Sequence, residues 1–178
     1  EQFCFSDEQY NGSPCTNLDA NVDDSGNVPK LNLTYRFDDG KLMYATYSEG
    51  FRPGGVNRND GSPYDADYLK NYEIGWKTTW ADGRVRVNGA TYFMQVNDII
   101  LDYLPDPILT PQFVESFNSG DTDVYGLEID ADAAITDQFF VGFNFSYLSY
   151  EFNDTVFPDG TDHTDTTELV WAPEYAYT

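Results

Sequence analysis

Few side chains in this sequence could perform covalent chemistry. His163 is the one histidine and therefore the only imidazole that could act as a general base. Asp130 and Asp132 lie two positions apart, so on a strand both carboxylates would share one face, as acid/base catalysis in a closed cleft requires. No nucleophile stands at a recognisable spacing from either group. We therefore predict a solvated loop histidine, a hydrated pair of acids and no enzymatic activity.

The two cysteines, Cys4 and Cys15, lie in a polar opening segment that spans residues 1–28. We expect a disulfide between them, which would indicate an oxidising compartment and would stabilise the fold by roughly 3 kcal/mol if unstrained. Two free thiols are the alternative. Without a histidine beside them, they do not make a zinc site.

A second acidic stretch of this segment loosely resembles a calcium loop. Asp19, Asn21 and Asp23 follow one another at alternate positions. However, Asp24 stands where such a loop needs glycine, and Lys30 stands where it needs a bidentate glutamate. We predict a solvated acidic loop with no metal, and no cofactor anywhere in the chain.

Composition limits the possible partners. The 178 residues include 31 acidic and 9 basic side chains, giving a net charge of -22. Nucleic acid and anionic membrane surfaces are excluded, because no basic patch exists to displace phosphate counterions. No run of 18 apolar residues predicts a transmembrane helix, and no signal peptide opens the chain. Since the sequence starts at Glu1 and stops within a pattern at Thr178, we expect a mature or partial chain.

Strands are the elements that must position these groups. Residues 72–80 alternate apolar and polar side chains, 81–83 supply a tight turn, and a second alternating run starts at Val85 and extends to about Leu101. Other alternating runs predict about seven strands in total. Their expected ranges are 31–37, 41–48, 72–80, 85–101, 125–135, 139–147 and an unfinished strand from Leu169.

Loop length alternates along the chain. The turns at 38–40, 81–83 and 136–138 are short, whereas the connections at 49–67, around 105–111 and at 151–168 are long and polar. In an antiparallel up-and-down meander all short turns then lie on one edge, which is typical of outer-membrane barrels. The sequence thus predicts an all-β fold.

Charged residues inside the strands fall on the face opposite the aromatic residues. They are Glu73, Lys77, Glu128, Asp130 and Asp132. A water-filled barrel lumen accommodates them, whereas a lysine on the lipid side at mid-depth would cost about 2–4 kcal/mol. The alternative is a water-soluble sheet with one solvated face.

Three passages resemble the C-terminal part of the barrel of TonB-dependent outer-membrane receptors. They are YATYSEGFRPGG at 44–55, YEIGWKT at 72–78 and VYGLEI at 124–129. The resemblance covers roughly residues 29–178 and implies part of a 22-stranded transmembrane β-barrel, with residues 1–28 as an external loop. The plug domain, the TonB box and enough strands to close such a barrel are missing from these 178 residues.

The resemblance implies a function in nutrient uptake. Such receptors lie in the outer membrane of Gram-negative bacteria with their long loops outside, and import ferric siderophores or other scarce nutrients with energy delivered through TonB. Partners would therefore be outer-membrane lipid, the TonB complex through the plug region, and a small-molecule nutrient. The alternative function is a secreted soluble β-sandwich that serves as an adhesion or carbohydrate-binding module.

External loops of such receptors contact the substrate, which identifies candidate ligand-binding residues here. Hydrogen-bond donors and an aromatic ring concentrate after the second strand, and two further aromatic residues flank the proline-rich loop. The candidates are Arg52, Asn57, Arg58, Asn59, Tyr64, Tyr103 and Phe113.

Overall fold

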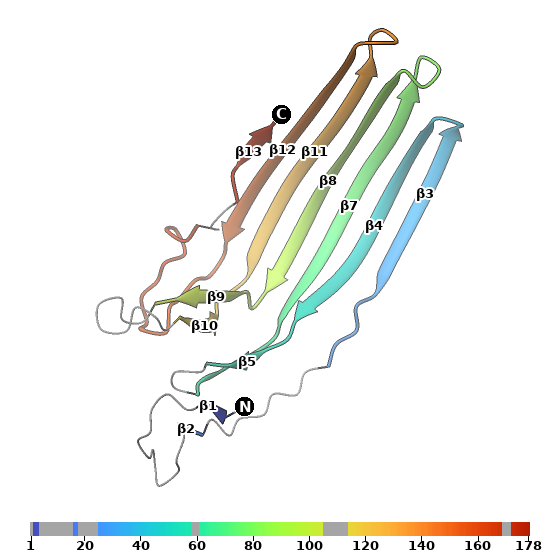
Figure 1. Ribbon diagram of the computed structural model, residues 1–178. Coiled ribbons are helices and arrows are strands. Elements are labelled where there is room, and N and C mark those ends of the chain that lie inside the picture. Colours follow the sequence, from blue (N-terminus) through green and yellow to red (C-terminus); the bar gives the residue numbers. More distant parts are fainter. Residues whose placement is uncertain (1, 4–15, 18–24, 58–60, 105–113, 169–171) are drawn as a thin grey trace.

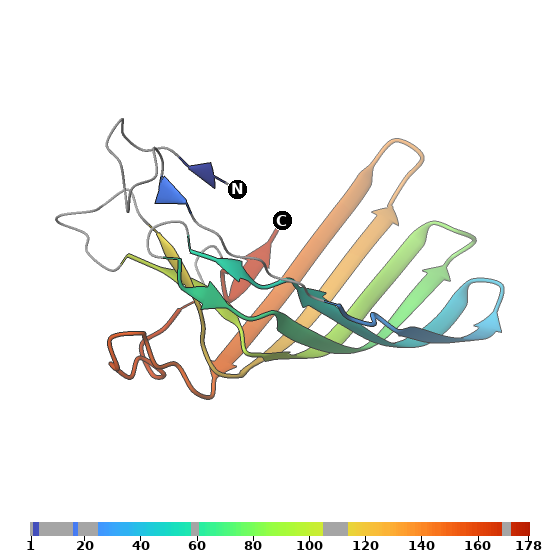
Figure 2. The same ribbon diagram turned by 90° about the horizontal axis from the view of Figure 1, so that it is seen from below.

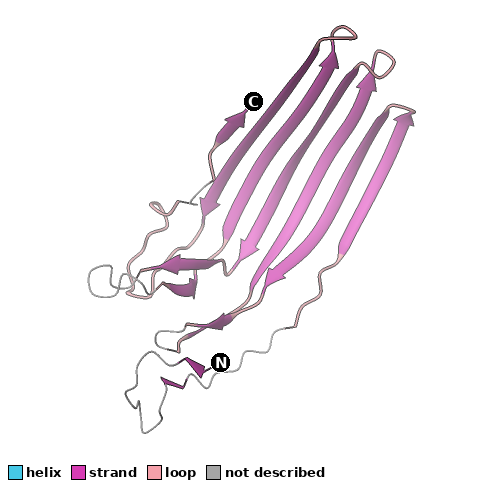
Figure 3. Cartoon of the chain, viewed as in Figure 1, coloured by secondary structure: helices cyan, strands magenta, loops and turns pink. Residues whose placement is uncertain are grey.

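A computed structural model describes residues 2–3, 16–17, 25–57, 61–104, 114–168 and 172–178. Over these ranges the fold is all β, as predicted (Figure 3). No helix that could span a membrane occurs among these residues.

One antiparallel sheet of seven strands dominates the molecule, with the order β13-β12-β11-β8-β7-β4-β3 (Figure 1). Three further pairs, β1 with β2, β5 with β6 and β9 with β10, are short. The strands of the large sheet are β3 (Lys30–Asp38), β4 (Lys41–Arg52), β7 (Asp67–Trp80), β8 (Val85–Asn97), β11 (Thr122–Ala134), β12 (Phe140–Phe152) and β13 (Tyr175–Tyr177). The short strands are β1 (Gln2–Phe3), β2 (Thr16–Asn17), β5 (Gly55–Val56), β6 (Pro63–Tyr64), β9 (Ile100–Tyr103) and β10 (Glu115–Asn118). The predicted meander of about seven strands is confirmed.

The tight turns all lie at one end of the sheet (Figure 1). Between β7 and β8 the chain reverses through three residues in the left-handed region, Ala81, Asp82 and Gly83, with φ values of 53°, 56° and 89°. The turn after β3 is held by Asp38, whose carboxylate accepts a hydrogen bond from the Gly40 amide at 3.0 Å. The long connections lie at the opposite end, as the alternation of loop lengths predicts.

One strand is shorter than the sequence indicates. We expected the strand that begins at Val85 to reach about Leu101, but β8 ends at Asn97. Asp98 adopts a φ of 54°, which turns the chain out of the extended conformation. Ile100 then begins β9, which pairs with β10 in a separate sheet. Alternation alone misses this break because the apolar pattern continues across it.

Other strands are longer or start later than predicted. β4 continues beyond Ser48 to Arg52, and β7 begins at Asp67, so residues 49–52 pair with residues 67–70 at the two ends of the stretch expected to be loop. Similarly, β12 extends to Phe152. The last described strand, β13, begins at Tyr175. Leu169, where we expected this strand to begin, lies outside the described residues.

The sheet is curved and open, with β3 and β13 at its two edges (Figure 2). Its register runs without a shift from β4 to β13, and β3 pairs with β4 in register up to a bulge between Arg36 and Asp38, so residues opposite one another across strands share a face. One face, called here the apolar face, carries most of the large apolar and aromatic side chains. It includes Leu31, Leu33, Tyr35, Met43, Ala45, Tyr47, Tyr72, Ile74, Trp76, Phe93, Tyr125, Leu127, Ile129, Phe143, Phe145, Tyr147, Tyr175 and Tyr177.

The opposite face, called here the polar face, carries the charged residues named above, as predicted. Tyr44 donates a hydrogen bond to Glu73 at 2.6 Å, and Asn88 donates one to Asp130 at 3.0 Å. Arg86 forms an ion pair with Asp132. A cavity of about 410 Å³ lies over this face, lined by side chains of β4, β7, β8, β11 and β12. Polar partners thus satisfy one another along a hydrated wall.

Two glycines on the polar face make room for tyrosine rings. The Tyr44 ring lies over Gly75 and the Tyr92 ring over Gly126, each from the neighbouring strand. A Cβ atom at either glycine would overlap the ring. Glycine within a strand therefore serves a close approach here, and the rings cover backbone that would otherwise be bare.

The large sheet has no dry interior among the described residues. Its apolar face is open: Leu33 is 73% exposed and Phe143 is 47% exposed. The buried apolar residues lie toward the end that carries the long connections, and they are Ala66, Ile99, Phe117, Val124 and Phe152. A soluble β-sandwich would cover one face with a second sheet, so this arrangement contradicts the sandwich alternative and fits a sheet whose apolar face meets lipid.

The same substitution should destabilise the protein strongly on the apolar face and only weakly on the polar face. Ile129 lies on the apolar face near the middle of the sheet, and Glu128 beside it lies on the polar face. We expect Ile129→Lys to lower the free energy of unfolding by about 2–4 kcal/mol in phospholipid vesicles, because it places a charge in hydrocarbon. Glu128→Lys, the matched control, should change it by less than about 1 kcal/mol. Urea unfolding of the vesicle-inserted barrel measures both, and equal costs would contradict the assignment of faces.

Candidate ligand-binding rim

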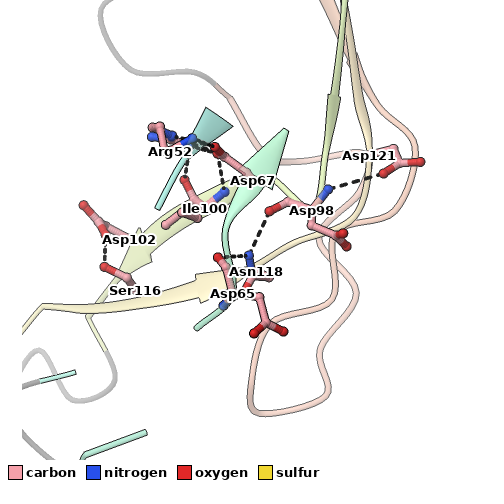
Figure 4. A network of polar contacts seen from close by, with 9 residues as sticks. All are labelled: Arg52, Asp65, Asp67, Asp98, Ile100, Asp102, Ser116, Asn118 and Asp121. Carbon is pink, nitrogen blue, oxygen red and sulfur yellow. Dashed lines mark hydrogen bonds and ion pairs between the residues drawn. The ribbon is translucent and has the colours of Figure 1, made fainter. Parts of the chain in front are cut away.

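The long connections fold together at one end of the large sheet, and we call this region the rim. It comprises the described residues 53–57, 61–66, 98–104, 114–121 and 153–167, together with the strand ends that carry them. Figure 4 shows the polar contacts at its centre. Each contact joins segments that are far apart in the sequence.

Arg52 and Asp67 connect the sheet to β9. The Arg52 Nε donates to both carboxylate oxygens of Asp67, at 3.1 and 2.8 Å, and Nη2 forms a further ion pair with Oδ2. Nη2 also donates to the Ile100 carbonyl at 3.1 Å, while the Ile100 amide donates to Asp67 at 3.2 Å. The Asp67 side chain is only 5% exposed, so its charge is balanced by a bidentate guanidinium and two backbone amides.

Asn57 joins the β5–β6 hairpin to β10. Its amide nitrogen donates to the Ser116 carbonyl and to Ser62 Oγ, at 2.7 and 2.9 Å. Its amide oxygen accepts a hydrogen bond from the Ser116 amide at 2.7 Å. Both ends of the buried Asn57 side chain are therefore satisfied within the chain.

Asn118 makes the same kind of connection on the other side of β10. Its oxygen accepts from the Asp65 amide at 2.6 Å, and its nitrogen donates to the carbonyls of Asp65 and Asp98, both at 2.9 Å. The Asp98 amide in turn points to the Asp121 carboxylate, 3.4 Å away (Figure 4). Asn118 therefore joins Asp98, at the break between β8 and β9, to Asp65, which lies between β6 and β7.

An aromatic cluster joins the third connection to the second. The Phe117 ring lies 5.3 Å from the ring of Tyr103 and 5.0 Å from that of Phe157, both edge to face. His163 packs on Phe157 at 4.4 Å, and Tyr103 donates a hydrogen bond to the buried Glu115 at 3.0 Å. Edge-to-face pairs contribute about 0.5–1.5 kcal/mol each beyond the area they bury, so the second and third connections stabilise each other.

Backbone donors organise the connection between β12 and β13. The Asp162 carboxylate accepts hydrogen bonds from the amide and the hydroxyl of Thr164, at 3.0 and 2.7 Å. Thr164 Oγ1 accepts one from the amide of Thr155 at 2.9 Å. The Thr164 amide, followed by its hydroxyl, holds the pKa of Asp162 below its ordinary value of 3.8.

The structure describes four of the seven predicted binding residues, and all four lie in the rim. Arg52 and Asn57 hold other segments, Tyr64 lies in β6, and Tyr103 belongs to the aromatic cluster. Their role in binding a ligand stays a prediction. Outside the described residues lie Arg58, Asn59 and Phe113, and also Cys4 and Cys15.

Sequence reasoning missed the residues that organise the rim. Asp67, Asn118 and Phe157 have no local signal, because each acts on segments more than 30 positions away or across a long connection. The only available indication was the rule that a buried charge requires a partner, and burial could not be read from the sequence.

The rim suits binding better than catalysis. His163 Nδ1 lies 3.2 Å from Thr166 Oγ1, a partner in its own turn. Within the described ranges, no group of three or more His, Cys, Asp or Glu side chains is placed to hold a metal ion. The rim presents aromatic and hydrogen-bonding side chains on segments that are held together by hydrogen bonds and ring contacts.

Comparison with known proteins identifies relatives of this chain. A family model described as "TonB dependent receptor-like, beta-barrel" matches residues 5–178. The ferrichrome outer membrane transporter/phage receptor of Escherichia coli (strain K12) is 30% identical over 131 residues, which are 72% of this chain and 17% of that protein. The ferric-pyoverdine 358 receptor of Pseudomonas putida is 31% identical over 72 residues, or 40% of this chain and 9% of that protein.

Solved structures share the fold at lower identity. The ferric yersiniabactin uptake receptor FyuA from Yersinia pestis has a TM-score of 0.63 at 21% identity, covering 84% of this chain and 22% of that one. The siderophore receptor PiuA from Acinetobacter baumannii also gives 0.63, at 18% identity and the same coverages. The chain therefore spans less than a quarter of the length of these relatives.

Because Asp67 is buried, its ion pair with Arg52 should stabilise the protein more than the ion pair between Arg86 and Asp132 on the polar face. We expect Arg52→Ala to lower the opening free energy at the Ile100 amide by about 1.5–3 kcal/mol, because a buried carboxylate loses its charged donor. The matched control is Arg86→Ala, which breaks an ion pair whose Asp132 side chain is 47% exposed and should cost about 0–1 kcal/mol. Hydrogen exchange measures the change in opening free energy in both variants. Similar changes would show that Asp67 does not anchor the rim.

The lowered pKa of Asp162 predicts an acid-sensitive connection. Because the folded pKa lies below 3.8, the ionised carboxylate stabilises this turn above pH 3.8, and the contribution is lost as the pH falls through the lower folded pKa. We expect protection of the Thr164 amide, corrected for intrinsic exchange, to stay constant from neutral pH and to fall only below about pH 4. In Asp162→Asn, which cannot titrate, this pH dependence should disappear, and an unchanged profile would exclude Asp162 as its cause.

Proposed function

Since the chain belongs to the TonB-dependent receptor-like β-barrel family, we propose that it forms part of an outer-membrane receptor that binds a ferric siderophore and takes it up with energy from TonB. In this proposal the large sheet lies in the outer membrane with its apolar face toward lipid, and family membership supports that location. The observation that carries the proposal is the match of residues 5–178 to the family model. The sheet agrees with it, because its tight turns lie at one end and the braced rim at the other.

The substrate class comes from the relatives. The similar curated proteins are receptors for ferrichrome and ferric pyoverdine, both ferric siderophores. A bulky ligand of this kind needs a wide contact surface with several donors and aromatic rings. The described rim provides such a surface.

Some rim residues remain available to a ligand. Arg52 keeps a side chain that is 59% exposed while it holds Asp67, so it can also donate to an acceptor on the ligand. Tyr64 and Tyr103 add half-buried aromatic surface to the rim. We include Arg58, Asn59 and Phe113 in the ligand-contacting set, and Asn57 as a residue that holds the surface in place.

We also propose roles for the opening segment and for the two edges of the large sheet. Residues 1–28 would form an external loop closed by a disulfide between Cys4 and Cys15. Residues 29–178 would pair through β3 and β13 with the other strands of a 22-stranded barrel, and a plug domain would contact TonB. Uptake of this kind involves binding and gated passage, and we propose no enzymatic step.

Uptake of iron by cells tests the function. A Gram-negative strain that lacks its own siderophore receptors is given the receptor that contains this chain, and is supplied with radioactive iron as ferrichrome or ferric pyoverdine. We expect uptake of at least one complex, with the signal falling to background in a tonB-deleted strain. Uptake that continues without TonB, or none from a panel of ferric siderophores when the receptor is present in the outer membrane, would contradict the proposal.

A further inference from the structure

Charge is divided unequally along the strands. Residues 49–67, 98–121 and 151–174, which contain the rim, carry 16 acidic and 2 basic side chains. The rest of the sequence from Pro29 onward, which contains the tight turns and most of each long strand, carries 9 acidic and 7 basic side chains. The end of the sheet that bears the rim is therefore strongly negative, whereas the remainder of the sheet is nearly balanced.

Most of the acids at the rim face water. Within the described parts of these three segments, eleven acidic residues are exposed. Three of them, Asp65, Asp98 and Asp121, are joined through Asn118 and the amide of Asp98 at the centre of the rim (Figure 4). The negative charge is therefore presented to an approaching ligand and is not enclosed within the fold.

The described rim has little positive charge to balance these acids. Arg52 is the only lysine or arginine in the described parts of the three segments, and its guanidinium is bound to the buried Asp67. The other basic residue of these segments, Arg58, lies outside the described residues. Four exposed carboxylates form no hydrogen bond or ion pair with any other described residue, and they belong to Asp65, Asp98, Asp154 and Asp165.

Acids of the third connection stay ionised at neutral pH. The Thr161 amide holds the pKa of Asp159 below 3.8, as the Thr164 amide does for Asp162. At physiological ionic strength such charges act over about 8 Å. Surface charges of one sign that lie together change association rates with charged ligands by roughly 10- to 1,000-fold. A charged ligand is therefore attracted or repelled before it contacts the rim.

Ferric siderophores differ in charge according to their chelating groups. Three hydroxamates carry one negative charge each and balance Fe³⁺, so their complex is neutral, or cationic where a protonated amine is attached. Three bound catecholates carry two negative charges each, so their complex is a trianion. Complementary charge favours encounter and like charge suppresses it, so the rim distinguishes these classes before any specific contact forms.

We propose that the rim selects ferric siderophores by charge, admitting neutral or cationic complexes of the trishydroxamate type and rejecting trianionic complexes of the triscatecholate type. This inference rests on the proposed function and specifies its substrate class. The aromatic rings of Tyr64 and Tyr103 contact the uncharged body of the ligand, and the exposed carboxylates determine which charge can approach. A trianion needs several free cations, whereas the guanidinium of Arg52 is already bound to Asp67.

Binding of three probes of different charge tests the selection. The receptor that contains this chain is purified in mild detergent and titrated with cationic ferrioxamine B, neutral ferrichrome and trianionic ferric enterobactin, with weak binding measured by competition. We expect at least one of the two trishydroxamates to bind, and the trianion to bind at least about tenfold more weakly at physiological ionic strength. High salt should narrow this preference, because it screens the rim.

Removing charge from the rim tests whether these acids are the cause. The rim variant replaces three unpartnered carboxylates by amides of the same size, in Asp65→Asn, Asp98→Asn and Asp154→Asn. The matched control removes as many exposed carboxylates at the tight turns, in Asp39→Asn, Asp82→Asn and Asp137→Asn. We expect the rim variant to bind ferric enterobactin about threefold to tenfold more tightly than the wild type, and the control to bind it as the wild type does.

Each outcome supports or overturns the inference. The expected order of affinities, with a change in the rim variant alone, supports it. Tighter binding of the trianion, no binding of either trishydroxamate, or the same affinity for the trianion in both variants overturns it. Uptake of iron is measured in the same strains, so a receptor that takes up another ferric siderophore keeps the proposed function and loses only this inference, whereas a receptor that takes up none loses both.

Discussion

The continuous register of the antiparallel ladder is the constraint on which the rest of this structure depends. Each strand alternates its side chains, and no interruption occurs between the neighbouring strands β4, β7, β8, β11 and β12. As a result, one face becomes apolar and the other polar over most of the sheet. A slip of one residue in a single strand would exchange its two faces and expose charges to lipid.

The rim follows a different physical rule. There the strands end, and their backbone groups and loop segments need partners that the ladder no longer supplies. Side chains take over this role: the buried carboxylate of Asp67 accepts from two backbone amides, and the amides of Asn57 and Asn118 bridge separate segments. Loops held in this way present a preformed surface, which lowers the entropic cost of binding a ligand.

Polarity differs between the two faces of the sheet, whereas net charge differs between its two ends. Along the strands, acids and bases occur in similar numbers, and partners lie on neighbouring strands, as Arg86 and Asp132 do. The rim lacks that balance, because its exposed acids have few cations beside them. One sheet can thus keep its hydrated wall nearly neutral and still give the rim a negative potential.

Local patterns along the chain were enough to predict the all-β class, a meander of about seven strands, the turn polarity and the two faces, because a period of two and turn residues are local properties. It also supported the family through three short passages. Only the tertiary structure decided where β8 ends, which residues brace the rim and which of its acids stay exposed. Asp98 turns the chain although the apolar pattern continues, and Asp67 acts on Ile100, 33 positions away. Such effects depend on burial and on contacts between distant segments, and no local pattern records either.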